Sequence, residues 1–330
     1  MRCLLVLLAA TCSATATATA AAPPAGVTGS APSRPDSHES SDKYQAWSTA
    51  AATALIARAD ADSLATAAAL RHAGPKPDPS ALDLAARASE LAPQNASIGW
   101  LRLQLCSGTP TCDIRDVATV MRWVDADNGA AWLHSLAVAQ KDPTEVDRIL
   151  ADMAQGARFD FYWNRLVVLM ADALHGVRND LPGSYLSSDA SRLNLVSGIV
   201  SGEFIPPFAA LVEACKESSA APERREPCLK LAKIMQRGDT VVAQLVGFGI
   251  ERRLHAPDSK EARTIADRRH VLEWRVAAAA KFDTALLPWT KNARARARLA
   301  QMRAMAREED VCIAILREHK MALDPPEVHP

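Results

Sequence analysis

The chain has 330 residues, of which 48% are hydrophobic and 5% aromatic, and its 38 basic and 38 acidic residues give a net charge of zero. This balance argues against a general role in binding nucleic acid or anionic surfaces. Helix formers such as alanine, leucine and arginine dominate and runs of β-branched residues are scarce, which favours helices along almost the whole chain.

The first 22 residues have the features of a secretory signal peptide. Arg2 precedes an apolar stretch at residues 4–10, and a stretch rich in alanine and threonine offers cleavage sites near Ala20 and Ala22. We therefore expect a periplasmic or secreted protein. The alternative is a lipoprotein acylated at Cys12, although the residues before this cysteine lack the leucine that a lipobox prefers. Residues 23–42 are rich in proline and serine and are expected to form a disordered linker.

The first predicted helix pair occupies residues 43–58 and 61–72. Two segments of similar design follow at 82–105 and 114–139, each with apolar residues at helical spacing on both sides of a polar turn. Between them, four positions match at a constant offset of 33 residues: Leu84 with Val117, Ala85 with Ala118, Leu91 with Val124 and Asn95 with Asn128. Three tryptophans recur at intervals of 32 and 31 residues: Trp100, Trp132 and Trp163.

These units resemble the tetratricopeptide repeat, in which an aromatic residue opens the first helix, a leucine follows three positions later and a proline ends the unit. Five positions fit this pattern besides the tryptophans: Leu103, Leu166, Ala85, Ala88 and Pro93. Gln104 and Ser135 depart from it. The resemblance covers residues 81–176 and implies stacked helix pairs with a concave face that typically binds peptides or proteins. We expect the repeat region as a whole to span residues 43–176.

The helical signal is less regular in residues 177–322, which are expected to pack on the repeats, and residues 323–330 form a tail. Proline and aspartate mark the start of most further helices, and Asp189 is the expected cap of one of them. The predicted helices are 142–154, 163–174, 189–200, 206–215, 227–236, 239–254, 258–281, 290–306 and 308–322. The predicted fold class is therefore all-α: an array of antiparallel helix pairs, partly a tetratricopeptide-like solenoid, closing into one curved unit.

The overall layout also resembles uncharacterised exported proteins of xanthomonad-type gammaproteobacteria. The resemblance rests on Trp47, the Ala-Pro-Gln-Asn turn at 92–95, the Asp-Ala-Asp-Asn turn at 125–128 and the closing Leu-Asp-Pro-Pro at 323–326. It implies the fold and the compartment, and it brings no known activity with it.

Five cysteines follow the predicted signal peptide, and four of them flank short loops between predicted helices. Cys106 and Cys112 enclose one turn-rich loop, and Cys215 and Cys228 enclose another. Each pair lies where antiparallel helices bring the chain ends together, and an exported protein permits disulfides. We therefore expect two disulfides, with Cys312 outside them as a small buried hydrophobe. Metal ligation is the competing interpretation, but no second close cysteine or histidine pair completes a zinc site.

No catalytic, metal or cofactor motif is apparent, so no cofactor is expected. No two histidines lie four residues apart and no Gly-x-Ser-x-Gly sequence occurs. Gly247-Phe248-Gly249 lies within an apolar helical stretch without a preceding strand, which favours close helix packing over dinucleotide binding.

The candidate partner-binding residues lie at the starts of the repeat helices. Arg102, His134 and Arg165 each follow a repeat tryptophan by two residues. On a shared concave face they would form a column of cations suited to an acidic segment or a peptide carboxylate. Phe161 and Tyr162 belong to the densest aromatic run and would grip a peptide if exposed. The alternative is that the three form the solvent-facing side of amphipathic helices and that the aromatic run fills the core.

Two functions remain open. The first is a non-enzymatic periplasmic interaction or scaffolding module that binds a protein or peptide, inferred from the fold alone. The second is an enzyme or small-molecule binder with a site in residues 177–322, which a pocket containing a carboxyl of perturbed pKa, such as Asp189 or Glu213, would favour. The basic helix from Lys291 to Arg307 would suit anionic lipid, but a solvated face balanced by the acids after it is the simpler interpretation. Nucleic acid is not an expected partner.

Overall fold

The computed structural model describes residues 37–74, 78–107, 109–178, 186, 188–216, 221–284 and 288–326. Every regular element in these ranges is a helix, so the predicted all-α fold class is confirmed. The predicted signal peptide, residues 1–22, and most of the expected linker lie outside the described residues. The end of that linker, residues 37–42, belongs instead to the first helix.

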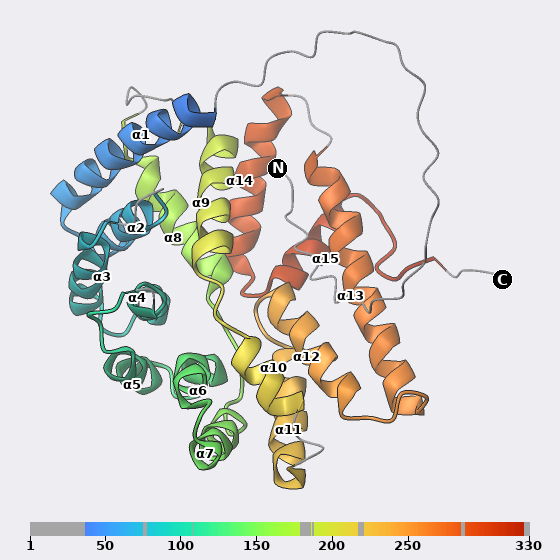
Figure 1. The fold of residues 1–330 in the computed structure, drawn as a ribbon. Coiled ribbons are helices and arrows are strands. Elements are labelled where there is room, and N and C mark those ends of the chain that lie inside the picture. The colour runs from blue at the N-terminus through green and yellow to red at the C-terminus, as the bar shows by residue number, and fades with distance from the viewer. Residues whose placement is uncertain are drawn as a thin grey trace, which may run out of the picture.

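The N-terminal half contains eight of the α-helices in the described ranges and one 3₁₀ helix, joined by short turns. They are α1 (Ser37–Arg58), α2 (Ala61–His72), α3 (Ser80–Leu91), α4 (Ala96–Ser107), α5 (Ile114–Val124), η1 (Gly129–Trp132), α6 (Leu133–Ala139), α7 (Pro143–Met153) and α8 (Trp163–His175). Each helix from α1 to α7 packs against the next, and together they follow an arc (Figure 1).

Local signals in the sequence set the start of several of these helices. The carboxylates of Asp60, Asp113 and Asp142 accept backbone N–H groups of the first turns of α2, α5 and α7. These bonds satisfy donors that have no partner inside the helix. Pro143 occupies the first turn of α7, where its missing N–H does no harm. The predicted start of α7 is therefore confirmed.

The second half consists of α9 (Asp189–Glu203), α10 (Ala209–Lys216), η3 (Pro222–Arg224), α11 (Arg225–Met235), α12 (Val241–Arg253), α13 (Lys260–Thr284), α14 (Pro288–Ala304) and α15 (Glu308–Glu318). Helix α9 is capped by Ser188, whose hydroxyl accepts the Ser191 N–H, so the prediction of Asp189 as the cap is wrong. Helix α10 begins at Ala209 rather than at the predicted residue 206.

Helix α8 ends the arc by turning back into the molecule. It packs against α2 rather than against the preceding helix α7, and it also lies against α9 and α14, with smaller contacts to α1 and α4. Figure 1 shows α8, α9 and α14 side by side along the inner side of the arc. The Arg58 guanidinium donates to the Ala173 carbonyl at 2.7 Å and ties the end of α1 to α8. The arrangement joins the two halves around one principal core, in which Trp47, Trp100 and Phe159 are fully buried.

A buried polar junction connects three segments that are distant in sequence. The Asp239 carboxylate, in the turn between α11 and α12, accepts the Phe161 N–H at 2.8 Å and the Trp163 N–H at 3.2 Å. The Glu308 carboxyl accepts the Val241 N–H at 2.7 Å, while the Glu308 N–H donates to the Asp239 carbonyl at 2.8 Å. These bonds fix the entry to α8 against the starts of α12 and α15.

Both predicted disulfides are present. Cys106 and Cys112 are joined with their Cα atoms 5.4 Å apart, and Cys215 and Cys228 with theirs 5.6 Å apart. Cys312 lies outside both disulfides and is half-buried rather than fully buried as expected. Disulfides of this kind persist in oxidising compartments. None of the helices in the described ranges is long and apolar enough to span a membrane.

Candidate functional site

The predicted cationic column does not form. His134 is only 4% exposed, and burial lowers its pKa to about 4, so it is neutral at pH 7. Arg165 is exposed, with its guanidinium carbon 5.9 Å from the Tyr162 ring centroid. Arg102 is half-buried and lines a cleft beside α3 and α5. The reason is a change of helix phase, because the unit that contains His134 begins with the 3₁₀ helix η1.

The aromatic run is part of the core, as the alternative interpretation held. Phe161 and Tyr162 are both buried, and the Phe161 ring stacks on Trp100 with centroids 5.3 Å apart. Tyr162 has a left-handed backbone conformation with φ 59°. Its hydroxyl donates to the buried Asp125 carboxylate and accepts from the Asn128 amide at 3.0 Å. Neither side chain is accessible to a partner.

The three repeat tryptophans are not equivalent. Trp100 is the fifth residue of α4 and is fully buried. Trp132 ends η1 and is half-buried, with the guanidinium groups of Arg122 and Arg148 at 4.2 Å and 5.7 Å from its ring centroid. Trp163 opens α8 and donates from its indole nitrogen to the Ser201 hydroxyl at 3.2 Å. The regular spacing of these residues therefore does not correspond to a regular environment.

A cleft of about 310 Å³ lies between α3, α4 and α5, and Arg102, one of the predicted partner-binding residues, lines it. The Cys106–Cys112 disulfide closes the α4–α5 loop beside it. The residues that line the cleft are Leu82, Asp83, Ala86, Arg102, Thr111, Cys112, Asp113, Asp116 and Val117. Three carboxylates therefore face one guanidinium, and the lining is negatively charged.

Most of these charged side chains have open hydrogen-bonding capacity. In the part of the chain that the structure describes, the side chains of Arg102, Asp83 and Asp116 make no hydrogen bond or ion pair, and the Arg102 Nε is buried without an acceptor. The Asp113 carboxylate caps α5 through the Arg115 N–H at 2.9 Å. Charged groups that the chain itself leaves unpaired are available to a partner.

An exposed apolar face of α5 continues from this cleft. Trp123 is 87% exposed and Val120 is 55% exposed. Because Asp116, Val120 and Trp123 follow one another at intervals of four and three residues, they lie on one side of the helix. The opposite side buries Ala118 and Met121. We call Asp116, Val120 and Trp123 together the α5 face. Sequence reasoning missed Trp123, although its position on the polar side of an amphipathic helix is visible in the spacing.

The residues proposed for an enzyme-like site do not form one. Burial opposes ionisation of Asp189, but hydrogen bonds and charge from Arg296 and Arg192 outweigh it and lower the Asp189 pKa. Glu213 is exposed, 3.4 Å from the Lys216 ammonium. Within the described ranges, no group of three or more metal-ligating side chains is arranged to hold an ion. Gly247 packs against α11, since a Cβ there would lie 2.7 Å from the Ala232 carbonyl oxygen.

Two cations of the basic helix α14 form ion pairs with carboxylates of other helices. Arg296 pairs with Asp189 of α9 at 2.8 Å, and Arg303 pairs with Asp172 of α8. Arg298 is buried. These contacts support the interpretation of α14 as a structural helix that joins the second half to α8 and α9.

Comparisons with protein-family models, with curated proteins and with solved structures find no match to this chain.

Proposed function

We propose that this chain is an exported, non-enzymatic interaction module that binds a protein partner through the α5 face and the adjoining cleft. The observation that carries the proposal is the 87% exposure of Trp123 in an otherwise well-packed helical array. Tryptophan is among the residues that contribute most to protein interfaces, because its large rigid ring is desolvated on binding.

The charge around this surface specifies the kind of partner. Asp83, Asp113 and Asp116 outnumber Arg102 in the cleft. A partner segment with basic and apolar side chains would match both the carboxylates and the apolar α5 face. The proposed partner is therefore basic, whereas a column formed by Arg102, His134 and Arg165 would have bound an acidic segment.

Two independent features support export of the protein. Residues 1–22 have the pattern of a secretory signal peptide, and the folded chain holds two disulfides. The intact mass of the protein from its native host tests this directly. A mature chain that begins after Ala20 or Ala22 supports export with cleavage, whereas one that begins at a lipid-modified Cys12 identifies a lipoprotein.

Comparative capture from a periplasmic extract tests the interaction. Trp123→Ala should weaken retention of the bound protein by at least about 30-fold, since truncating such a residue at the centre of an interface costs roughly 2 kcal/mol or more. Ile205→Ala is the matched control, because Ile205 is also an exposed apolar residue but lies outside this surface. A partner that binds both variants as tightly as the parent chain would exclude the α5 face.

A further inference from the structure

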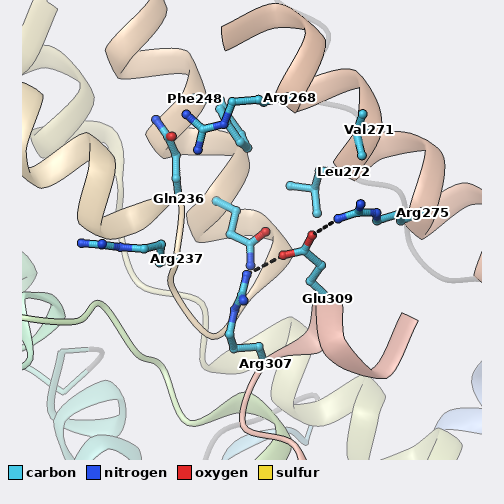
Figure 2. Close-up of a pocket in the computed structure, with 10 residues that line it drawn as sticks. Gln236, Arg237, Phe248, Arg268, Val271, Leu272, Arg275, Arg307 and Glu309 are labelled. Carbon is cyan, nitrogen blue, oxygen red and sulfur yellow. Dashed lines mark hydrogen bonds and ion pairs between the residues drawn. The ribbon is translucent and has the colours of Figure 1, made fainter. Parts of the chain in front are cut away.

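A second pocket, of about 360 Å³, lies in the other half of the molecule. The turn between α11 and α12, helix α12, helix α13 and the start of α15 form its walls. Its lining combines arginine side chains with an apolar wall (Figure 2). It is remote in sequence from the α5 face, and the proposed interaction does not use it.

One carboxylate in the pocket already occupies two of the arginines. Glu309 accepts from Arg275 at 2.8 Å and also pairs with Arg307. Figure 2 shows the Glu309 carboxylate between these two guanidinium groups. Arg275 donates further to the Leu323 carbonyl at 2.9 Å and to Asp324 at 3.3 Å, and Arg307 lies 3.7 Å from Asp310. The charges of Arg275 and Arg307 are therefore compensated.

Arg268 has no such compensation. In the described part of the chain it has no hydrogen-bonded or acidic partner, and its guanidinium lies 5.2 Å from the centroid of the Phe248 ring. The residues one turn away from it on α13 carry no charge: Thr264, Ile265, Val271 and Leu272. In Figure 2 its side chain lies beside Phe248 at one end of the pocket, while Arg237 extends away from the group.

The polar lining also has unmet hydrogen-bonding capacity. Gln236 is only 5% exposed, and its amide nitrogen donates to the Glu251 carboxylate at 2.5 Å. Its amide oxygen is buried without a hydrogen-bond partner among the described residues, and so is the Nε of Arg307. Buried polar groups in folded proteins are nearly always paired, and those left unpaired tend to lie where a ligand or water completes them. The Arg307 Nε can donate to a bound carboxylate, whereas the Gln236 oxygen, itself an acceptor, needs a donor such as water.

We propose that this pocket binds a small organic monocarboxylate with an apolar body. One uncompensated guanidinium, that of Arg268, matches one negative charge, whereas a phosphate dianion would need more than one. The wall formed by Phe248, Val271 and Leu272 would contact the apolar body directly beside the charged group. Guanidinium groups suit carboxylates because they donate two parallel hydrogen bonds. The volume is near the lower end for ligand pockets, which limits the ligand to a small molecule.

Isothermal titration calorimetry on the disulfide-bonded chain tests the site with benzoate as the probe. Benzoate should bind saturably with one-to-one stoichiometry. Acetate, inorganic phosphate and benzyl alcohol should each bind at least tenfold more weakly, because each lacks either the apolar body or the single carboxylate. Equal binding of phosphate or acetate would overturn the proposed ligand class, and absence of benzoate binding would overturn the site.

Variants on α13 locate the binding. Arg268→Ala should weaken benzoate binding at least tenfold. Arg263→Ala, an exposed arginine on the same helix without a partner in the described ranges, should leave it unchanged. Because the Arg268 side chain is exposed and makes no hydrogen bond, the variant should unfold at the same temperature as the parent chain. Benzoate binding that is equally strong in Arg268→Ala would place the ligand elsewhere and overturn the assignment.

Discussion

Two buried carboxyl groups at the junction of the two halves make the stability of the protein depend on pH. Burial raises the pKa of Asp239 well above its ordinary value; nearby Asp160 adds to the rise, and the hydrogen bond from the Phe161 N–H opposes it. Burial also raises the pKa of Glu308 from 4.5 to about 7, against the hydrogen bond from the Val241 N–H. Both groups are therefore harder to ionise in the folded chain than in the unfolded chain.

The number of protons bound in the folded and unfolded states decides whether a rise in pH raises or lowers the free energy of unfolding. Between pH 4.5 and 7 the unfolded chain has released the Glu308 proton while the folded chain still holds it. The free energy of unfolding therefore falls as the pH rises through this window, by at most about 3 kcal/mol from Glu308. The raised pKa of Asp239 also makes the free energy of unfolding fall as the pH rises.

Glu308→Gln should flatten this dependence, because the amide oxygen can still accept the Val241 N–H and has no proton to lose. Urea unfolding at a series of pH values measures the effect, with the exposed Glu213→Gln as the control. The Glu308→Gln variant should be more stable than the parent at pH 8 and should lose less stability between pH 4.5 and pH 8. An unchanged slope in this variant would contradict the assignment.

Tyr162 supports the core through its hydroxyl as well as its ring. The hydroxyl donates to the buried Asp125 carboxylate and accepts from Asn128. Tyr162→Phe removes this donor from a buried carboxylate, so we expect a loss of about 1–3 kcal/mol in the free energy of unfolding. A double-mutant cycle with Asp125→Ala, which removes the acceptor, isolates the contact. A coupling energy near zero would show that the hydroxyl bond does not contribute.

At the level of helices, the two disulfides stabilise loops of different length. Cys106–Cys112 spans 6 residues in sequence and Cys215–Cys228 spans 13. Loop-closure entropy predicts a contribution of about 2 kcal/mol for the shorter loop and about 3 kcal/mol for the longer one. Each disulfide is removed by replacing both of its cysteines with serine, and urea unfolding is measured under oxidising conditions. Loss of Cys215–Cys228 should lower the free energy of unfolding more than loss of Cys106–Cys112. The reverse order would show that loop length does not control the difference.

Local signals make most helices and both disulfides predictable. Asp142 and Pro143 mark the start of α7 in the sequence itself, and the cysteine pairs flank short loops. Contacts between distant segments are not predictable in this way. The spacing of Trp132 and Trp163 does not show that one contacts two arginines while the other opens a helix packed on α9. The environment of each tryptophan depends on tertiary packing, which a regular spacing does not encode.

The candidate surface is predictable only in part. The position of Arg102 after Trp100 singles it out, and it does line the cleft. The prediction for His134 is wrong because a 3₁₀ turn shifts the helix phase, which sequence spacing does not reveal. The spacing places Trp123 on the polar side of its helix, but it does not show that no other element covers the ring. The balance between three aspartates and one arginine depends on how α3, α4 and α5 come together.

On the scale of the whole molecule, the core extends through both halves rather than ending at residue 176. The inner helix α8 buries Leu166, Met170 and Leu174 between the arc and the second half. A fragment of residues 37–178 should therefore expose this apolar surface, bind a hydrophobic dye and unfold with low cooperativity. Chemical denaturation of the fragment and of the full chain measures the difference. Equal midpoints would show that residues 37–178 fold independently.

The return of α8 to α2, and of α14 to α8 and α9, also determines when the molecule can be completed during its synthesis. Translation proceeds from the N-terminus at roughly 5–20 residues per second, so α14 follows α8 by on the order of ten seconds. Throughout that interval the flank of α8 that will receive α14 lacks its cover. During this interval the flank of α8 is open to other contacts, so the inner layer of the fold cannot be completed until the last third of the chain has been made.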